Sequence, residues 1–385
     1  MYRILTPTIL LITSLTTNIS CNVLRDVEQE IREDIFDIYR GVAIKTKEIT
    51  GNNVTKDQMK LRMFRNRPEP TKLVLNDTDL HLLRNTKGRL VFITHGWTDS
   101  SDSDWMLNLK EAFLTKYPDD VVILVDWREP AGKLYYISSI NVYDIGNFLA
   151  ETIEKLLDEH DIKPSQLLLI GHSLGGQTMG FVGKRLQKSG RKLPRIVALD
   201  PAGPLFDIRP ADKRLNPSDA DVVEVIHSDA GTFGFKDSCG TIDFYPNGGN
   251  MQPGCYRVDI SSLPGVKEPV LCDHRRSYHY FIEAVPHPKD YLVAVECSEW
   301  NVLRKTCDLN NTVALGDLTT TKTGEFYFNT NRNFPFNINH LGQPRGFIDA
   351  VESVGRGVKN EADEVSKKIK NGVSKLSSGV KNLFH

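Results

Sequence analysis

Short apolar runs recur along the chain, and each ends in glycine or polar residues. Five of them are rich in aliphatic and β-branched residues: RLVFITHGW (89–97), VVILVDW (121–127), LLLIGHS (167–173), RIVALDP (195–201) and VVEVIHS (222–228). Runs of this length are typical of fully buried strands. Apolar residues spaced three and four apart predict helices over residues 142–160 and 175–186. This alternation predicts an α/β fold, with a mostly parallel sheet covered by helices on both faces.

The two ends of the chain carry different patterns. Residues 1–20, MYRILTPTILLITSLTTNIS, have one arginine and then an apolar stretch too short to span a bilayer, which predicts a secretory signal peptide. Residues 338–385 carry apolar side chains stepping by three or four from Phe347 to Leu383, interrupted by glycines. We therefore expect one large domain over residues 21–337, which is long enough to form a catalytic domain. The tail over 338–385 is predicted to be an amphipathic helix that contacts membranes peripherally, or a disordered extension.

The third apolar run ends in a serine between glycines. Gly171, Ser173 and Gly175 form the pattern G-x-S-x-G between a predicted strand and a predicted helix. In that context the pattern places a serine on a sharp corner, where its hydroxyl is accessible to a base and to a substrate. The same residues also suit an ordinary tight turn. The flanking strand and helix favour Ser173 as a nucleophile on an α/β-hydrolase sheet.

A serine nucleophile needs an acid and a histidine, which follow it in that chain order in this fold. Asp200 closes the first strand after the nucleophile helix and is the predicted acid, whereas Asp126 also ends a strand but precedes the serine. His227 ends a predicted strand and is a candidate base. His274 is another candidate, because it follows Cys272 by two residues and a disulfide there could fix its loop against the sheet. The pattern alone does not choose between them. The other downstream histidines are His279, His287, His340 and His385.

An oxyanion hole needs two N–H donors aimed at the developing negative charge. In α/β hydrolases one comes from the residue after the nucleophile and the other from an upstream loop. These positions are Leu174 and, in the stretch THGW that ends the first run, Trp97. We interpret His95 in the same stretch as structural, because the backbone supplies the donors.

Charge and cysteine content narrow the class of protein. The 385 residues include 48 Lys and Arg and 49 Asp and Glu, a balance that argues against nucleic acid as the main partner. Five of the six cysteines lie between positions 239 and 307 without CxxC spacing, which favours disulfides over a metal site. Asn53, Asn76 and Asn310 begin sequons for N-glycosylation. We expect a secreted, extracellular protein that uses no cofactor and no metal.

Taken together, the motifs resemble the animal pancreatic-lipase family, in particular its insect phospholipases A1. VFITHGW, GHSLGG, ALDPAGPLF, DFYPNGG, QPGC and CDHRRSYHYF occur in the family's order. The resemblance implies an α/β-hydrolase fold with a Ser173–Asp200–His274 triad, and it selects His274 over His227. It also implies Trp97 and Leu174 as the oxyanion-hole donors. Because few residues follow, we expect no counterpart of the family's C-terminal β-sandwich domain.

The resemblance further implies two disulfides, one between Cys255 and Cys272 at the base of a lid and one between Cys297 and Cys307. A bond between Cys21 and Cys239 would follow only by elimination. The lid segment, YRVDISSLPGVKEPVL, is shorter than in triacylglycerol lipases and longer than in venom phospholipases A1, and the loop TFGFKDSCGTIDF is also short. In the family, short versions accompany phospholipase A1 activity. An open, less apolar rim admits a charged headgroup without removing its water.

Some family members hold calcium near the stretch that runs here from Arg214 to Asp219. In this chain the family's upstream glutamate is Ala211, and its first aspartate is Asn216. Fewer anionic oxygens weaken the binding of a hard cation. We therefore expect no calcium site.

The expected function is a secreted serine ester hydrolase acting on phospholipids or acylglycerols at a lipid–water interface. A phospholipase A1 that releases the sn-1 fatty acid is the favoured form, and a triacylglycerol or galactolipid lipase is the alternative with the same chemistry. A catalytically silent, yolk-type lipid-binding protein is the alternative from another class, since fold does not imply function. The presence of all three triad residues favours an enzyme.

Overall fold

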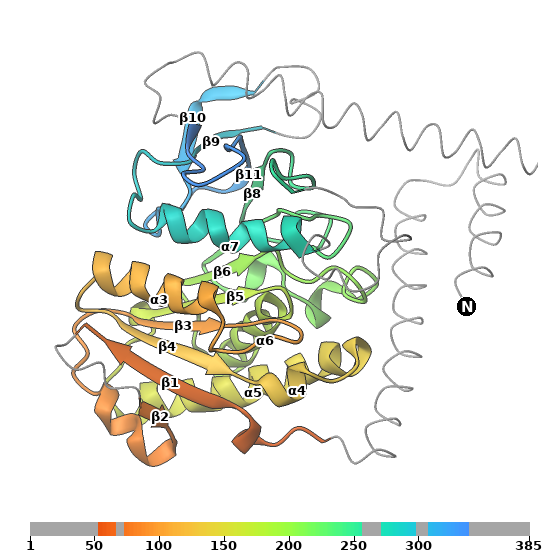
Figure 1. The fold of residues 1–385 in the computed structure, drawn as a ribbon. Helices are drawn as coiled ribbons and strands as arrows, with labels where there is room; N and C mark the ends of the chain where they lie inside the picture. Colours follow the sequence, from red (N-terminus) through yellow and green to blue (C-terminus); the bar gives the residue numbers. More distant parts are fainter. Residues whose placement is uncertain (1–52, 67–72, 256–270, 298–306, 339–385) are drawn as a thin grey trace, which may run out of the picture.

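The computed structural model describes residues 53–66, 73–255, 271–297 and 307–338. In these ranges eleven strands form one sheet, in the order β10-β9-β11-β8-β7-β6-β5-β3-β4-β1-β2 (Figure 1). The strands are β1 (Lys60–Arg65), β2 (Leu73–Leu75), β3 (Leu90–Thr94), β4 (Val121–Asp126), β5 (Leu167–His172), β6 (Arg195–Leu199), β7 (Val222–Ile226), β8 (Ile242–Pro246), β9 (Val293–Glu296), β10 (Asp308–Ala314) and β11 (Gly324–Phe328).

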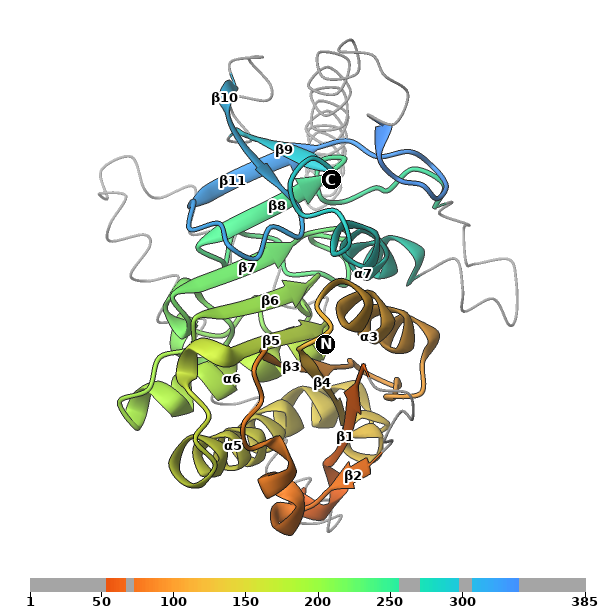
Figure 2. The ribbon, with the colours of Figure 1, turned by 90° about the vertical axis from the view of Figure 1, so that its left-hand side faces the viewer.

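The centre of the sheet is parallel, from β4 through β3, β5, β6, β7 and β8 to β11. Antiparallel pairs form only toward its two edges, where β1 joins β4 and β9 joins β11. The helices are α3 (Asp104–Lys116), α4 (Arg128–Ala131), α5 (Tyr135–Glu159), α6 (Leu174–Lys188) and α7 (Cys272–Ala284). Helices α5 and α6 cover one face, and α3 and α7 the other (Figure 2). The loops after β3, β5, β6 and β7 therefore meet at one sheet edge, where functional groups of such folds gather.

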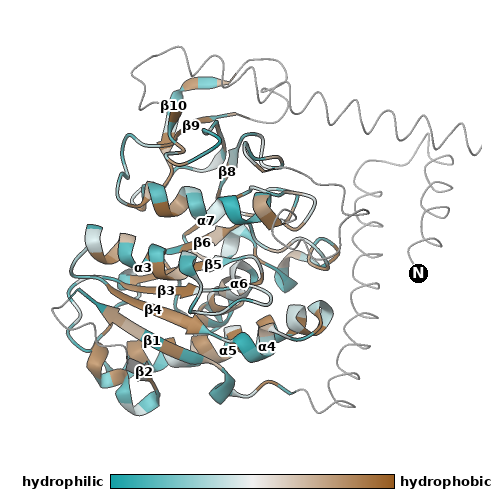
Figure 3. Ribbon diagram, in the orientation of Figure 1, coloured by the Kyte–Doolittle hydropathy of each residue, from teal (hydrophilic) through white to brown (hydrophobic). Residues whose placement is uncertain are grey.

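The core has two halves, one on each face of the sheet. Along β3, Leu90 and Phe92 pack with the α5 and α6 side, whereas Val91 and Ile93 pack with the α3 and α7 side. Strands β3 and β4 are accordingly apolar over almost their whole length (Figure 3). Full burial of each such side chain stabilises the fold by about 1.5–3 kcal/mol.

These features confirm the predicted α/β-hydrolase sheet. The five predicted strands are present, and their last one to three predicted residues lie in the loops beyond them. The helix predicted from residue 142 begins at Tyr135, because Ser138 and Asn141 are buried and donate to the Pro130 carbonyl. Apolar spacing does not reveal helical turns that bury polar side chains.

Several predictions fall on residues beyond these ranges. The signal peptide over 1–20, Cys21, most of the lid segment and the tail after residue 338 lie outside the described residues. Within the described ranges, no helix combines the length and apolar character needed to cross a membrane.

Candidate active site

Ser173 stands at the corner between β5 and α6 in a backbone conformation that side-chain-bearing residues rarely adopt. Its φ is 57° and its ψ is −122°, a strained geometry that persists only where the surroundings enforce it. A Cβ on Gly171 would lie 2.2 Å from the Gly175 carbonyl oxygen, and one on Gly175 would lie 2.7 Å from the His95 carbonyl oxygen. Close backbone contacts therefore require both glycines of the G-x-S-x-G pattern, and an ordinary turn would not.

Asp200 and His274 meet from different elements. Asp200 follows β6 and is completely buried, and His274 lies in the first turn of α7, also buried. His274 Nδ1 is 2.6 Å from Asp200 Oδ2, so the ring N–H donates a charge-assisted hydrogen bond to the carboxylate. This tautomer leaves Nε2 with its lone pair, as a general base requires.

The other Asp200 oxygen is held by the segment after β7. Asp200 Oδ1 accepts from the backbone N–H groups of Ser228 at 2.8 Å and Asp229 at 3.1 Å. Burial raises the pKa of Asp200, and these two donors oppose that rise. Burial, and then the charge of Arg275, lowers the pKa of His274, whereas the adjacent carboxylate favours the charged ring. A His274 ring that is neutral at neutral pH is free to accept a proton.

His227, the other candidate base, belongs to a different pair. Its Nε2 lies 2.8 Å from Asp243 Oδ1, and its Nδ1 lies 3.1 Å from the Phe235 carbonyl oxygen. Burial alone would lower the pKa of His227, but Asp243 and then Asp200 raise it above its ordinary value. With a hydrogen-bond acceptor at each ring nitrogen, His227 is held as a donor. The ring that bonds the Asp200 carboxylate is that of His274.

Asp126, the other candidate acid, is also engaged elsewhere. It accepts from the Ser101 hydroxyl at 2.6 Å and from Arg128 Nε at 2.9 Å. Asp126 therefore ties the end of β4 to the loop after β3. It does not orient His274.

The two predicted oxyanion donors flank Ser173. Leu174 is the first residue of α6, so its N–H is one of the helix amides that lack an intrahelical acceptor. Trp97 follows Gly96, and a Cβ on Gly96 would lie 2.7 Å from the Ser173 Cβ. Both backbone segments thus reach the serine, as a two-donor oxyanion hole requires.

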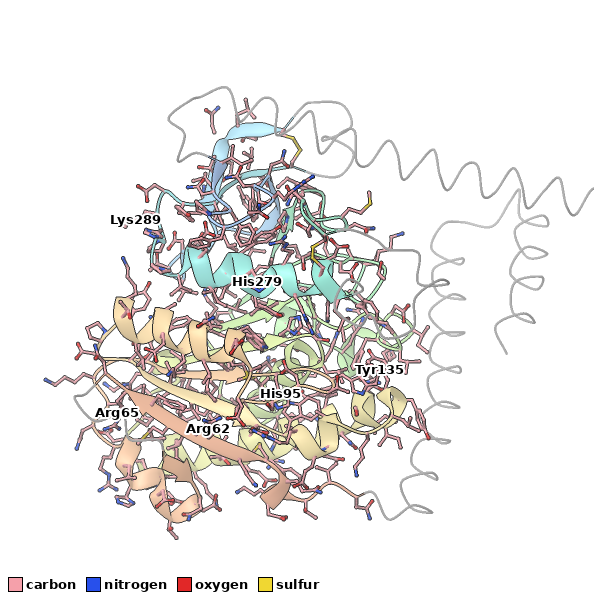
Figure 4. The ribbon with its side chains drawn as sticks, viewed as in Figure 1. Arg62, Arg65, His95, Tyr135, His279 and Lys289 are labelled. Atoms are coloured by element: carbon pink, nitrogen blue, oxygen red, sulfur yellow. A yellow bond between two sulfur atoms is a disulfide. The ribbon has the colours of Figure 1, made fainter. Side chains whose placement is uncertain are left out.

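A cavity of about 830 Å³ opens beside these residues, a volume typical of ligand pockets. Trp97 is 41% exposed and meets the Tyr135 ring edge-on, with ring centroids 5.3 Å apart. Figure 4 labels Tyr135 at the start of α5, His279 in α7 and His95 after β3. Besides Ser173 and His274, the cavity is lined by aromatic and by charged side chains, among them Trp97, Trp105, Tyr135, Phe233, Tyr278, Asp99, Asp104 and Arg275.

Two residues beside Ser173, Asp200 and His274 were not predicted. His172 Nε2 lies 3.2 Å from the His274 carbonyl oxygen, and the two rings lie 4.5 Å apart. Ser228 gives its amide to Asp200, and its hydroxyl accepts from the Ser277 amide at 3.1 Å. His172 is the last residue of β5, and Ser228 follows the end of β7 by two residues. Their position at or just after a strand end was the available signal.

Four cysteines form the two disulfides that the family resemblance implied, and the sequon residues lie on the surface. Cys255 pairs with Cys272 and Cys297 with Cys307, with Cα–Cα distances of 5.5 Å and 4.7 Å, which suit disulfides. The first bond joins α7 at its first residue, so His274 lies in a helix and not in the loop that we expected. Cys239 is a buried free thiol. The sequon residues Asn53, Asn76 and Asn310 are all exposed.

The residues near Asp219 do not fit a calcium ion. Lys184 Nζ donates to both carboxylate oxygens of Asp219 and to the Arg214 carbonyl oxygen, each at 2.6 Å. Asp219 is completely buried, and Asn216 caps the following turn. The ammonium thus neutralises the oxygens that a hard cation would need.

Replacing Lys184 with methionine should therefore destabilise the fold strongly. The change keeps the side chain as far as Cε, removes the ammonium group, and leaves the Asp219 carboxylate buried without its cation. We expect the free energy of unfolding, measured by urea denaturation, to fall by about 3–5 kcal/mol. Lys188→Met, at an exposed position of the same helix, is the matched control and should cost no more than about 0.5 kcal/mol. Equal, small effects of the two variants would refute the cation role of Lys184.

The chain is similar in sequence to known lipases and phospholipases. A family model described as Lipase matches residues 40–336. "Phospholipase A1 2" from Vespa affinis is 33% identical over 310 residues, covering 77% of this chain and 86% of that protein. "Pancreatic triacylglycerol lipase" from Cavia porcellus is 36% identical over 231 residues, covering 57% of this chain and 48% of that protein. "Inactive pancreatic lipase-related protein 1" from Homo sapiens is 36% identical over 222 residues, covering 54% and 46%.

The chain spans about half the length of these two pancreatic relatives and most of the Vespa protein. The family match includes β3, the corner at Ser173, Asp200 and the first turn of α7. By this match and its fold, the chain belongs to the pancreatic-lipase family of α/β hydrolases.

Proposed function

We propose that this protein is a serine ester hydrolase with Ser173 as nucleophile, His274 as general base and Asp200 as the acid that orients the base. The observation that carries the proposal is the 2.6 Å hydrogen bond between His274 Nδ1 and the buried Asp200 Oδ2, together with a cavity lined by both His274 and Ser173. Membership of a lipase family supports ester hydrolysis. A serine on a strained corner beside an oriented imidazole supports this particular mechanism.

In the proposed reaction, His274 Nε2 takes the hydroxyl proton as Ser173 Oγ attacks the ester carbonyl carbon. The Trp97 and Leu174 amides stabilise the resulting oxyanion. When the carbon–oxygen ester bond breaks, His274 protonates the departing alkoxide, and an acyl-serine remains. Water, deprotonated by the same imidazole, then releases the fatty acid and restores Ser173.

The proposed substrate is a phospholipid cleaved at the sn-1 ester. The cavity contains two acidic side chains, Asp99 and Asp104, and the basic Arg275, which suit a zwitterionic headgroup better than neutral fat. The loop after β7 folds back on the 201–203 segment through the Phe233 carbonyl and the Phe235 amide, and of its residues only Phe233 lines the cavity. The long match to "Phospholipase A1 2" supports the same class.

A comparison of substrates tests this proposal. The full chain should release fatty acid faster from 1-palmitoyl-2-oleoyl-phosphatidylcholine vesicles than from emulsified triolein, and the acid released from the phospholipid should be palmitate. The Ser173→Ala variant, expressed and purified in the same way, gives the background rate for both assays. Faster triolein hydrolysis would favour the triacylglycerol lipase alternative, and oleate release from the phospholipid would contradict sn-1 cleavage.

A catalytically silent lipid-binding role is the second candidate. It is favoured by one observation, the relative named "Inactive pancreatic lipase-related protein 1". Binding of phospholipid vesicles with no hydrolysis above the Ser173→Ala background would establish it.

We also propose that the chain is exported. Two disulfide pairs suit an oxidising compartment, and the exposed sequon residues Asn53, Asn76 and Asn310 suit N-glycosylation there. A fall in apparent mass on treatment with an N-glycosidase, after expression in a secretory cell, would support both export and N-glycosylation.

A further inference from the structure

His95 lies directly behind the proposed oxyanion hole, and the mechanism above gives it no role. It follows β3 and is completely buried, as is Trp127 beyond the end of β4. The two rings stack, with centroids 5.5 Å apart and planes 12° from parallel. In Figure 4 the His95 label lies near the middle of the view, between the labels of Arg62 and Tyr135.

Hydrogen bonds determine which ring nitrogen of His95 carries the proton. The Trp127 backbone N–H donates to His95 Nε2 at 3.1 Å, so Nε2 is an acceptor. The nearest oxygen of Asp126 lies 3.7 Å from Nε2, too far for a hydrogen bond. His95 Nδ1 lies 2.9 Å from the Gly96 carbonyl oxygen. The ring is therefore neutral and protonated on Nδ1, and it donates to that carbonyl.

The Gly96 carbonyl and the Trp97 N–H belong to the same peptide group. Because a trans peptide is planar, these two bonds point in opposite directions. A hydrogen bond that fixes the carbonyl therefore also fixes the direction of the N–H. The His95 carbonyl is itself held by the Trp127 indole N–H at 3.1 Å, so the peptide planes on both sides of Gly96 are fixed from β4.

The corner at Ser173 leaves the backbone of residues 95–97 little room. A Cβ on Gly96 would lie 2.7 Å from the Ser173 Cβ, and a Cβ on Gly175 would lie 2.7 Å from the His95 carbonyl oxygen. The 95–97 backbone is thus confined on one side by the corner at Ser173 and on the other by Trp127. Its orientation within that space depends on the His95 ring.

We propose that His95 is a positioning residue for the oxyanion hole: its Nδ1–H holds the Gly96–Trp97 peptide so that the Trp97 amide faces the developing oxyanion. The inference rests on the proposed function, because it requires ester hydrolysis at Ser173. A donor that is already oriented stabilises the transition state without reorganisation. Loss of one such donor lowers kcat by about 10²–10³-fold in comparable hydrolases.

Two substitutions separate the two bonds of the ring. The amide nitrogen of asparagine occupies the position of Nδ1, so His95→Asn keeps a donor for the Gly96 carbonyl and loses the acceptor for Trp127. The amide of glutamine occupies the position of Nε2, so His95→Gln keeps that acceptor and loses the donor. Each variant keeps one of the ring's two hydrogen bonds, so each is the matched control of the other.

The experiment measures kcat and KM on a soluble p-nitrophenyl ester and on the thionoester in which sulfur replaces the carbonyl oxygen. Sulfur is a poor hydrogen-bond acceptor, so the preference for the ester reports on the oxyanion hole. We expect His95→Gln to lower kcat by about 10²-fold with little change in KM, and to lose most of the ester preference. His95→Asn should retain more activity and an ester preference close to that of the unmodified protein.

Losses that are equal in the two variants, or that track their thermal unfolding with unchanged ester preference, would overturn the proposal. If neither variant folds, ¹⁵N NMR of the unmodified full chain decides: the inference requires a His95 ring protonated on Nδ1, and protonation on Nε2 would overturn it. Ser173→Ala separates the two ideas. Hydrolysis that survives this change refutes the proposed function, whereas its loss together with indistinguishable His95 variants refutes only the positioning role.

Discussion

Replacing Ser173 with alanine is expected to lower turnover of phospholipid and of soluble esters by about 10⁴–10⁶-fold. Without the hydroxyl, no acyl-serine forms, and the remaining groups can only bind the substrate and polarise its carbonyl. Alanine has the same backbone constraints as serine at a φ of 57°, so the corner should keep its shape. The change is measured as fatty acid release at saturating substrate.

The fold of this variant has to be checked independently. Its thermal unfolding and circular dichroism should match those of the unmodified protein, and it should still bind phospholipid vesicles. Turnover within tenfold of the unmodified protein would show that Ser173 is not the nucleophile.

Asparagine at position 200 is expected to lower kcat by about 10⁴-fold, as the corresponding change does in other serine hydrolases. The amide can still accept from Ser228 and Asp229, but its NH₂ group would face His274 Nδ1. The ring would then carry its proton on Nε2 and could not take the proton of Ser173. Because asparagine tolerates positive φ and Asp200 has a φ of 45°, the backbone should be unaffected.

Asp126→Asn is the matched control, because Asp126 bonds Ser101 and Arg128 and not His274. It should lower kcat far less than Asp200→Asn does. A larger loss from Asp126→Asn than from Asp200→Asn would exchange the roles of the two aspartates.

The positions of the proposed nucleophile and of the proposed acid followed from the apolar runs. Runs such as Leu167–Ile170 are buried on both faces of the sheet, so they are apolar without interruption and can be recognised. Parallel pairing then brings the ends of β5 and β6 to one edge, and with them Ser173 and Asp200. Local pattern and sheet topology were sufficient for these two residues.

The choice between His227 and His274 could not be made from the pattern. The choice depends on Asp243 in β8, which forms a hydrogen bond with His227 Nε2, and on the packing of α7, which brings His274 to Asp200. Both are contacts between segments far apart in the sequence. The resemblance to a known family supplied the choice in advance.

The surroundings of the site were equally hidden. The hydrogen bonds of the His95 ring could not be predicted, because one of them comes from the Trp127 amide, 32 residues away. Lys184 likewise gave no sign in the sequence that it neutralises Asp219. Hydrogen-bond direction and ion pairing are tertiary properties, and periodicity carries no information about them.

Active-site labelling shows whether Ser173 is the nucleophile. A fluorophosphonate transfers its phosphonyl group to an activated serine oxygen with release of fluoride, and mass spectrometry of the digested protein locates the adduct. We expect one phosphonyl group per chain on Ser173, none in the Ser173→Ala variant, and much slower labelling in Asp200→Asn. Labelling of another serine, or a protein that hydrolyses lipid esters while Ser173 stays unlabelled, would contradict this role of Ser173.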